Sequence, residues 1–238
     1  MVKALAVAQN AFLNMSTLGL SSLTGLNGNI EIESSSGSRQ SRQTEVVSWL
    51  SGDNVSLVAN DTVYARGAEL TVEQDMLVMS GGNVVWDAAI DQQSSHSYDN
   101  SEGGIGTSTE AFTRTSETTV NGVNATAGGN LSVIAGGNIQ MVAAALEAGE
   151  DATLQADGSI ALLSADEHYQ SISQVRGKGD LGTANSLTKE ELNRSVAVVS
   201  SIVANNIQIS SGGDQYHAAT ALTADNDISL DAGGAIHF

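Results

Sequence analysis

The chain has 238 residues, contains no proline and no cysteine, and carries a formal net charge of −18 at pH 7. The lack of cysteine excludes disulfides and thiolate metal sites, and the negative charge argues against binding to nucleic acid or to an anionic membrane surface. Proline cannot donate a hydrogen bond to a sheet, so its absence favours a chain made almost wholly of paired strands.

Residues 1–20 form the first predicted unit, a leader or cap segment. The opening MVKALAVAQN has a lysine and a short apolar run that is too brief for a secretory signal. No apolar run in the chain approaches the roughly 20 residues of a membrane span. We therefore assign residues 21–238 to a single repeat domain.

Turn residues that precede an apolar, polar, apolar triplet recur through this domain at spacings of 8, 13 and 8, separated by intervals of 47. They are Asn54, Thr62, Asp75, Asn83, Asn130, Asn138, Asp151, Ser159, Asn206, Asp214, Asp227 and Ala235. The three resulting blocks superpose without a gap, each displaced by 76 in the numbering from the one before. Internal repetition on this scale governs the fold.

The spacings predict an all-β fold, a right-handed parallel β-helix. The spacings of 8 and 13 together give a suitable length for one three-sided coil, and two coils make one repeat. Alternation within the strands points one set of apolar residues inward, where it stacks on like residues of the next coil. This inward set includes Leu131 and Val133, Ile139 and Met141, and Ile160 and Leu162. Asn and Gly are expected at the corners because they adopt left-handed conformations at least cost.

One column of corners alternates between asparagine and aspartate along the rod of stacked coils. The column comprises Asn54, Asp75, Asn130, Asp151, Asn206 and Asp227. Alternation keeps carboxylates two coils apart and allows each amide to donate to a carboxylate above or below it. We interpret the column as a structural ladder in preference to a calcium site.

Three insertions interrupt the coils, and we call them excursions. They lie near residues 34–45, 87–121 and 163–197. Alternating Ser and Thr on both sides of a glycine turn predicts a long β-hairpin for the second excursion. In the third, Thr188 and Glu191 form a capping-box pattern that favours a short helix. The first excursion is predicted to be about a third as long as the others, counted from a marker at Asn29, which suggests that the rod closes without a long insertion.

Coils with AGGN and AGED corners, broken by Ser-rich excursions around a GGxG tip, resemble the haemagglutinin repeats of filamentous-haemagglutinin-type exoproteins. That group includes the stems of contact-dependent growth inhibition effectors. The resemblance covers roughly residues 21–238. It implies a secreted protein, extracellular or attached to the surface of a Gram-negative bacterium, and export through an outer-membrane two-partner transporter. It also implies adhesion to a receptor on a target cell, or delivery of a C-terminal toxin into neighbouring bacteria.

The residues themselves indicate no catalytic site, no metal site and no cofactor. The histidines do not share equivalent positions, and none has a second histidine at a metal-ligand spacing. Asp166, Glu167 and His168 could perform acid and base chemistry, but a solvated strand end explains them more simply. We therefore predict a non-enzymatic stem. The alternatives are a β-helical polysaccharide lyase or hydrolase, and a spacer that binds nothing.

The excursions are the predicted contact surface, because the rod offers few large side chains whereas the excursions carry aromatic and arginine residues. Such residues dominate interface energies. The candidates are His96, Tyr98, Phe112, Arg114, Tyr169, Ile172 and Arg176. The alternative role for these side chains is to pack the excursions against the rod.

Overall fold

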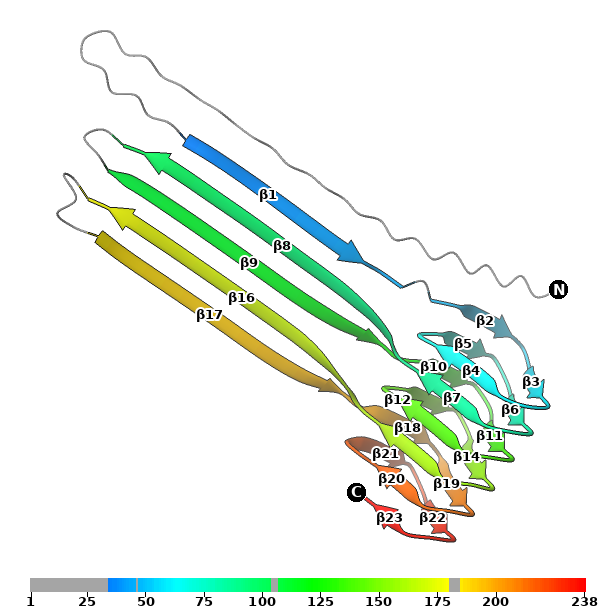
Figure 1. The fold of residues 1–238 in the computed structure, drawn as a ribbon. Helices are drawn as coiled ribbons and strands as arrows, with labels where there is room; N and C mark the ends of the chain where they lie inside the picture. The colour runs from blue at the N-terminus through cyan, green and yellow to red at the C-terminus, as the bar shows by residue number, and fades with distance from the viewer. Residues whose placement is uncertain (1–33, 46, 104–106, 180–184) are drawn as a thin grey trace, which may run out of the picture.

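The computed structural model describes residues 34–45, 47–103, 107–179 and 185–238, and within them every helix or strand is a β-strand. The predicted leader or cap segment, residues 1–20, and the turn marker at Asn29 lie outside the described part. The strands form two bodies, a rod of stacked coils and an arm of long strands that extends to one side of it (Figure 1). We use the names rod and arm for these two bodies throughout.

The rod contains three six-stranded parallel sheets, and each coil contributes one strand to each sheet. The first sheet comprises β2 (Trp49–Gly52), β5 (Glu69–Val72), β10 (Asn124–Ala127), β13 (Ala145–Ala148), β18 (Ser200–Ala204) and β21 (Thr220–Ala224). The second comprises β3 (Val55–Ala59), β6 (Met76–Ser80), β11 (Leu131–Ala135), β14 (Asp151–Ala156), β19 (Asn206–Ser211) and β22 (Ile228–Ala232). The third comprises β4 (Val63–Arg66), β7 (Val84–Asp87), β12 (Ile139–Val142), β15 (Ile160–Leu163), β20 (Gln215–His217) and β23 (Ile236–His237). The described chain thus makes a parallel β-helix of six coils.

The interior of the rod confirms the predicted inward residues. Leu131, Val133 and Leu154 are fully buried, and the register stacks Leu131 on Met76 of the coil before and on Ala152 of the coil after. Residues between them face outward, as the alternating burial of β11 shows. Apolar columns that run through successive coils therefore form one continuous core.

The corner glycines correct our expectation about backbone conformation. Among the described residues a positive φ occurs at Gly67, Ala143 and Ala219, and not in the paired glycines of the AGGN corners. Those glycines are required by close stacking instead, since a Cβ at Gly128 would collide with the backbone carbonyl of Glu73 in the coil before it. The three positive-φ residues occupy equivalent positions in successive repeats and close the corner that leads from the third sheet to the first in coils without an arm hairpin.

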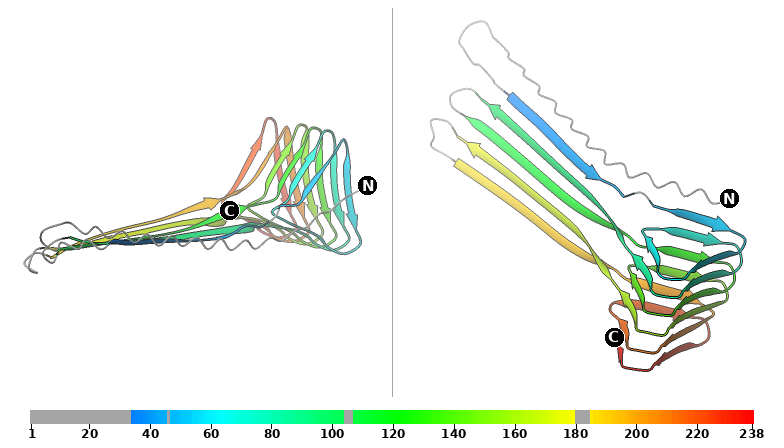
Figure 2. Two further views of the ribbon diagram at one scale, coloured as in Figure 1. Left: turned by 90° about the horizontal axis from the view of Figure 1, so that it is seen from above. Right: turned by 45° about the vertical axis from the view of Figure 1, so that its right-hand side comes forward.

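The arm is one antiparallel sheet of five strands in the order β1-β8-β9-β16-β17. These strands are β1 (Ser34–Gln43), β8 (Ala89–Glu102), β9 (Ser108–Asn121), β16 (Ala165–Lys178) and β17 (Asn185–Val198). The excursions near residues 87–121 and 163–197 are therefore the hairpins β8–β9 and β16–β17, as predicted. Pairing between β9 and β16 joins them into a single sheet that projects away from the rod (Figure 2).

Two predictions about the excursions were wrong. The expected helix at Thr188 is part of β17, which pairs with β16 over its whole length and so overrides the local capping signal. The first excursion is not the short insertion that we predict, because β1 is already a long strand that pairs with β8 from Ser34 to Gln43. The short predicted length depended on the marker at Asn29, outside the described residues. In the described rod this corner closes without an arm strand in the alternate coils, at Gly67, Ala143 and Ala219.

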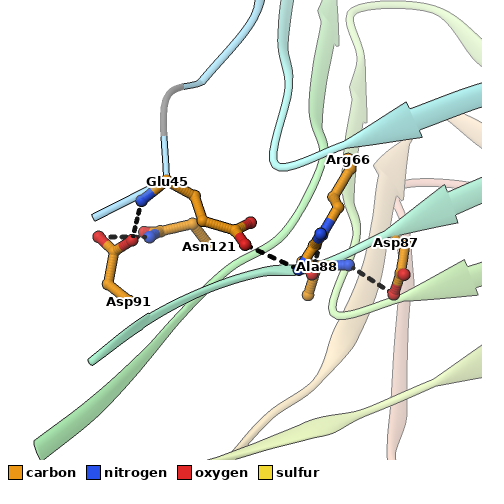
Figure 3. A network of polar contacts seen from close by, with 6 residues as sticks. All are labelled: Glu45, Arg66, Asp87, Ala88, Asp91 and Asn121. Carbon is orange, nitrogen blue, oxygen red and sulfur yellow. Dashed lines mark hydrogen bonds and ion pairs between the residues drawn. The ribbon is translucent and has the colours of Figure 1, made fainter. Parts of the chain in front are cut away.

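Carboxylates fasten the base of the arm to the rod (Figure 3). Asp91 accepts the backbone N–H of Glu45 at 2.7 Å and the side-chain amide of Asn121 at 3.2 Å. The Glu45 carboxylate pairs with Arg66 of β4 at 2.9 Å. Glu167, which occupies the position of Asp91 in the next repeat, accepts the N–H of Val120 at 3.1 Å in the same way. Each arm strand that leads away from the rod, which we call ascending, is thus hydrogen-bonded at its base to the strand that leads back to the rod before it, which we call descending.

In the fifth coil, strand β20 of the third sheet places two polar side chains inside the rod, where the equivalent strands of the earlier coils place apolar ones. Gln215 is 0% exposed and donates to the carbonyl of Asp231 at 2.6 Å. His217 is 3% exposed, contacts Gln215 through Nε2 at 3.2 Å and stacks on Phe238. Its Nδ1 is buried without a hydrogen-bond partner among the described residues. Burial lowers the pKa of His217.

Candidate contact surface on the arm

The arm register gathers most of the predicted contact residues on one face. Directly opposed residues in antiparallel strands point to the same side of a sheet. His96 opposes Arg114, Tyr98 opposes Phe112, and Arg114 opposes Ile172 on its other side. Arg176 lies two residues after Gln174, which opposes Phe112, and so shares this side. We call this side of the arm the contact face.

The aromatic residues of the contact face form a cluster across β8 and β9. The rings of His96 and Phe112 meet edge to face with centroids 4.9 Å apart, and the rings of His96 and Tyr98 lie 6.4 Å apart. Tyr98 is 41% exposed. An open hollow of about 410 Å³ lies next to the cluster and is lined by Tyr98, Phe112, Glu110 and Arg176. A ligand could thus stack on a ring and reach charged groups at the same place.

The cluster is not used to attach the arm to the rod. Figure 2 shows the arm sheet as a thin layer that leaves the rod at its base. Residues of both faces along the described arm strands are exposed or half-buried, apart from Ala89 and Val120 near the base. Packing against the rod, the alternative role for these side chains, therefore does not describe this arrangement.

Positive charge is concentrated on the arm. Within the described residues Arg66 is the one Lys or Arg of the rod, and all others lie on arm strands. The arm cations are Arg39, Arg42, Arg114, Arg176, Lys178, Lys189 and Arg194. Arg176 lies 3.8 Å from Glu110 in an exposed ion pair of little energetic weight. Arg114 has no ion pair among the described residues, so its guanidinium is available to an anionic or planar polar partner.

The opposite side of the arm carries mainly hydroxyl groups, and we call it the hydroxyl face. Ser97 opposes Thr113, and Ser95 opposes Thr115 with their side-chain oxygens 2.5 Å apart. Tyr169 opposes Glu117 and also lies on this side. The structure therefore separates Tyr169 from the other predicted contact residues.

Sequence reasoning missed three members of the contact face. Arg39 of β1 lies directly opposite His96, and Leu187 and Lys189 of β17 lie opposite Arg176 and Gln174. Asn193 and Lys189 flank Glu191, and their contacts lower the pKa of that carboxyl. The alternation in β1 and β17 carries the signal for these residues, but a short insertion and a helix are the sequence predictions for those two segments.

The corner column of the rod is a chain of hydrogen bonds between coils. The side-chain oxygens of Asn54, Asp75, Asn130 and Asn206 accept backbone N–H groups of the following coil at 2.8–3.3 Å. The amides of Asn130 and Asn206 also donate to Asp75 and Asp151, at 3.2 and 2.7 Å. These contacts satisfy the corner backbone and give the column a structural role.

A second column was marked in the sequence but not recognised as a ladder. The side chains of Asn83, Asn138, Ser159 and Asp214 accept backbone N–H groups of the next coil at 2.8–3.1 Å. The Ala235 N–H and the Tyr216 hydroxyl both bond Asp214 and lower its pKa, and that carboxylate in turn raises the pKa of Tyr216. Two corners of each coil are therefore fastened by side chains of the coil before.

The acidic residues near His168 do not assemble into a catalytic group. Asp166 and His168 lie on the contact face, whereas Glu167 points to the other side and bonds Val120. No group of three or more His, Asp or Glu side chains in the described part of the chain could hold a metal ion. In the same residues no helix is long and apolar enough to cross a membrane.

Comparison with known proteins points to one family. The family model for the hemagglutinin repeat matches residues 30–113 and 105–238. No match is found among curated proteins or among solved structures.

Proposed function

The chain belongs to the hemagglutinin repeat family, and we propose that it is a non-enzymatic stem segment whose arm makes the contacts with a target cell. The family is that of filamentous-haemagglutinin-like exoproteins of adhesin type, which are secreted or exposed at the cell surface. The observation that carries the proposal is the clustering of exposed and half-buried aromatic and arginine side chains on one face of the arm.

The division of side chains between the two bodies supports this role for the arm. The rod exposes larger side chains such as Trp49, Val58 and Tyr64 on three separate sheets, where they form no shared cluster, and its corners are occupied by the hydrogen-bonded ladders. The arm offers a cluster of rings, a hollow lined by Tyr98 and Arg176, and the available guanidinium of Arg114. Buried rings and arginines dominate the energy of most interfaces. We therefore place the receptor-binding surface on the contact face.

We further propose that the protein leaves a Gram-negative cell through an outer-membrane transporter of the two-partner type. The family resemblance supports this route, and a chain without disulfides can be threaded unfolded. The stem then presents the arm for adhesion, or carries a C-terminal toxin to a neighbouring bacterium. Secretion should require co-expression of the partner transporter, and a gene for such a transporter beside the gene for this chain is the expected neighbour.

The binding proposal is tested by paired substitutions on the two faces of the arm. Tyr98→Ala with Phe112→Ala removes an opposed pair on the contact face, and Ser97→Ala with Thr113→Ala changes the neighbouring pair on the hydroxyl face. We expect the first variant to lower attachment to target cells about tenfold and the second to leave it unchanged, because hot-spot residues contribute more than about 1 kcal/mol each.

Melting temperatures of both variants verify that the fold is retained. Attachment that survives the contact-face substitutions in a folded protein would move the binding surface elsewhere and would support a spacer role for the arm. Equal losses in both variants would also contradict the assignment. Turnover of a polysaccharide by the purified chain would favour the enzymatic alternative.

Point substitutions are preferable to deletion of a hairpin. Replacing residues 92–117 by a short turn would remove β8 and β9 from the centre of the sheet. β1 would then lose its partner strand and β16 one of its two partners, so reduced attachment could result from misfolding of the arm.

A further inference from the structure

The last strand of the arm has an open edge. Within the described residues the sheet ends at β17, and its residues from Asn185 to Ala197 are all exposed. Leu187 and Leu192 are 61% and 57% exposed. Long unpaired edges are templates for strand addition, and soluble proteins usually protect them. A strand of 14 residues with exposed leucines therefore calls for a partner.

The preceding hairpin shows what that partner is. Strand β16 covers the corresponding edge of β9, pairing antiparallel from His168 opposite Thr118 to Lys178 opposite Ser108. Thr118 also opposes Gln92 within its own hairpin, and Ser195 opposes His168, which occupies the position of Gln92 in the next repeat. Thr118 and Ser195 are therefore equivalent positions. The open edge of β17 is the edge that β9 presents to β16.

We propose that the edge of β17 binds the ascending arm strand of a further repeat unit, in the register of the β9–β16 pair. Ser195 would then oppose the equivalent of His168 in that unit, and Glu191 would oppose the equivalent of Ile172. The N–H of Ala197 would donate to the equivalent of Glu167, as Val120 does to Glu167 itself.

The interface continues a rule that the structure already contains twice. β8 covers β1 as β16 covers β9, and in both cases a carboxylate near the rod end of the covering strand accepts an N–H at the rod end of the covered strand, from Glu45 just after β1 and from Val120 in β9. Each unit adds two strands to the arm and two coils to the rod. The arm is then a continuous sheet along the fibre that repeats the contact face once per unit. Such repetition raises avidity without strengthening any single site.

Cysteine crosslinking tests the register, because the chain has no cysteine of its own. The chain is extended by a second copy of residues 163–238, with Ser195→Cys in the parent part and His168→Cys in the added copy. Opposed residues lie about 4.5–5.5 Å apart between Cα atoms, within the span of a disulfide. Thr118→Cys with His168→Cys in the parent chain is the positive control, since the structure already pairs these residues.

We expect mild oxidation to give an intramolecular disulfide in the extended chain at a level similar to the control. Moving the added cysteine to the copy of Ile172 should prevent it, because the two sites would then be out of register. Hydrogen exchange of the amides in residues 185–198 should slow in the extended chain compared with the parent. Crosslinking at both registers, crosslinks between molecules, or unchanged exchange would each overturn the proposal.

A peptide experiment tests the same register without requiring the added copy to fold. If the added copy does not fold, the parent chain with Ser195→Cys is mixed with a synthetic peptide of residues 163–178 that carries the same His168→Cys change. A disulfide with this peptide, and none with the peptide that carries Ile172→Cys instead, supports the proposal. Failure of both peptides to exceed a scrambled peptide contradicts it. Neither result depends on attachment to cells, so the proposed function and the edge interface are tested separately.

Discussion

Substitution of Leu131 by aspartate should be among the most destabilising single changes in the rod. Leu131 is 0% exposed in the third coil, between Met76 and Ala152 of the adjacent coils. Truncation of a buried leucine to alanine costs about 2–5 kcal/mol, and a buried polar group without partners adds about 1–3 kcal/mol. The expected loss for Leu131→Asp is thus about 5 kcal/mol. Asn130→Ala should cost about 1–2 kcal/mol, since its hydrogen bonds are exposed to water.

The control for Leu131→Asp is Ser132→Asp, which places the same carboxylate one residue further along β11 on the outward side. We expect little change there. For a chain of this size 1 kcal/mol corresponds to about 2–4 °C in Tm, so Leu131→Asp should lower the Tm measured by circular dichroism by about 10–20 °C. A Tm for Ser132→Asp or Asn130→Ala at or below that of Leu131→Asp would refute the assignment of inside, outside and corner.

Two further predictions concern backbone conformation and pH. Ala219→Gly should raise the free energy of unfolding by about 0.5–1 kcal/mol in urea titrations, because Ala219 is exposed at a φ of 51° that alanine adopts at a cost. Ala143→Gly should raise it less, because the Ala143 methyl group packs in a buried cluster. A larger increase for Ala143→Gly would contradict this reasoning. Burial lowers the pKa of His217 in the folded chain, so protonation favours unfolding: stability present above the ordinary pKa of about 6.5 is lost as pH falls below it. His217→Leu should therefore reduce the difference in Tm between pH 7.5 and pH 5.0, and an unchanged difference would exclude His217 as its source.

The rod could be predicted from the sequence because its residues obey one strict spacing. Each turn marker fixes the start of a strand, so Asn130 and Asn138 directly precede β11 and β12, and alternation then separates inward from outward residues. The asparagine and aspartate column was readable for the same reason. The role of the corner glycines was not, because the close approach of Gly128 to Glu73 depends on how coils stack and leaves no mark in a local pattern.

The arm was harder to predict because it lacks an apolar face. Both sides of the sheet are solvated, so its strands carry no signal that distinguishes a partner strand from water. Thr188 and Glu191 fit a helix start locally, yet β17 is a strand because β16 pairs with all of it. The pairing of β9 with β16 could not be read from either hairpin alone.

The lack of a core also explains why the hairpins join. An isolated two-stranded hairpin is at best marginally stable in water, and three or more strands are needed for independent stability. The hairpins β8–β9 and β16–β17 leave the rod two coils apart. Each hairpin is two strands wide, so this separation places β9 beside β16. Lateral pairing then gives β9 and β16 a neighbour on each side, and Glu167 holds them together at the base. The rod thus sets the spacing of the hairpins, and the sheet that they form keeps the contact face in one plane at a distance from the acidic rod.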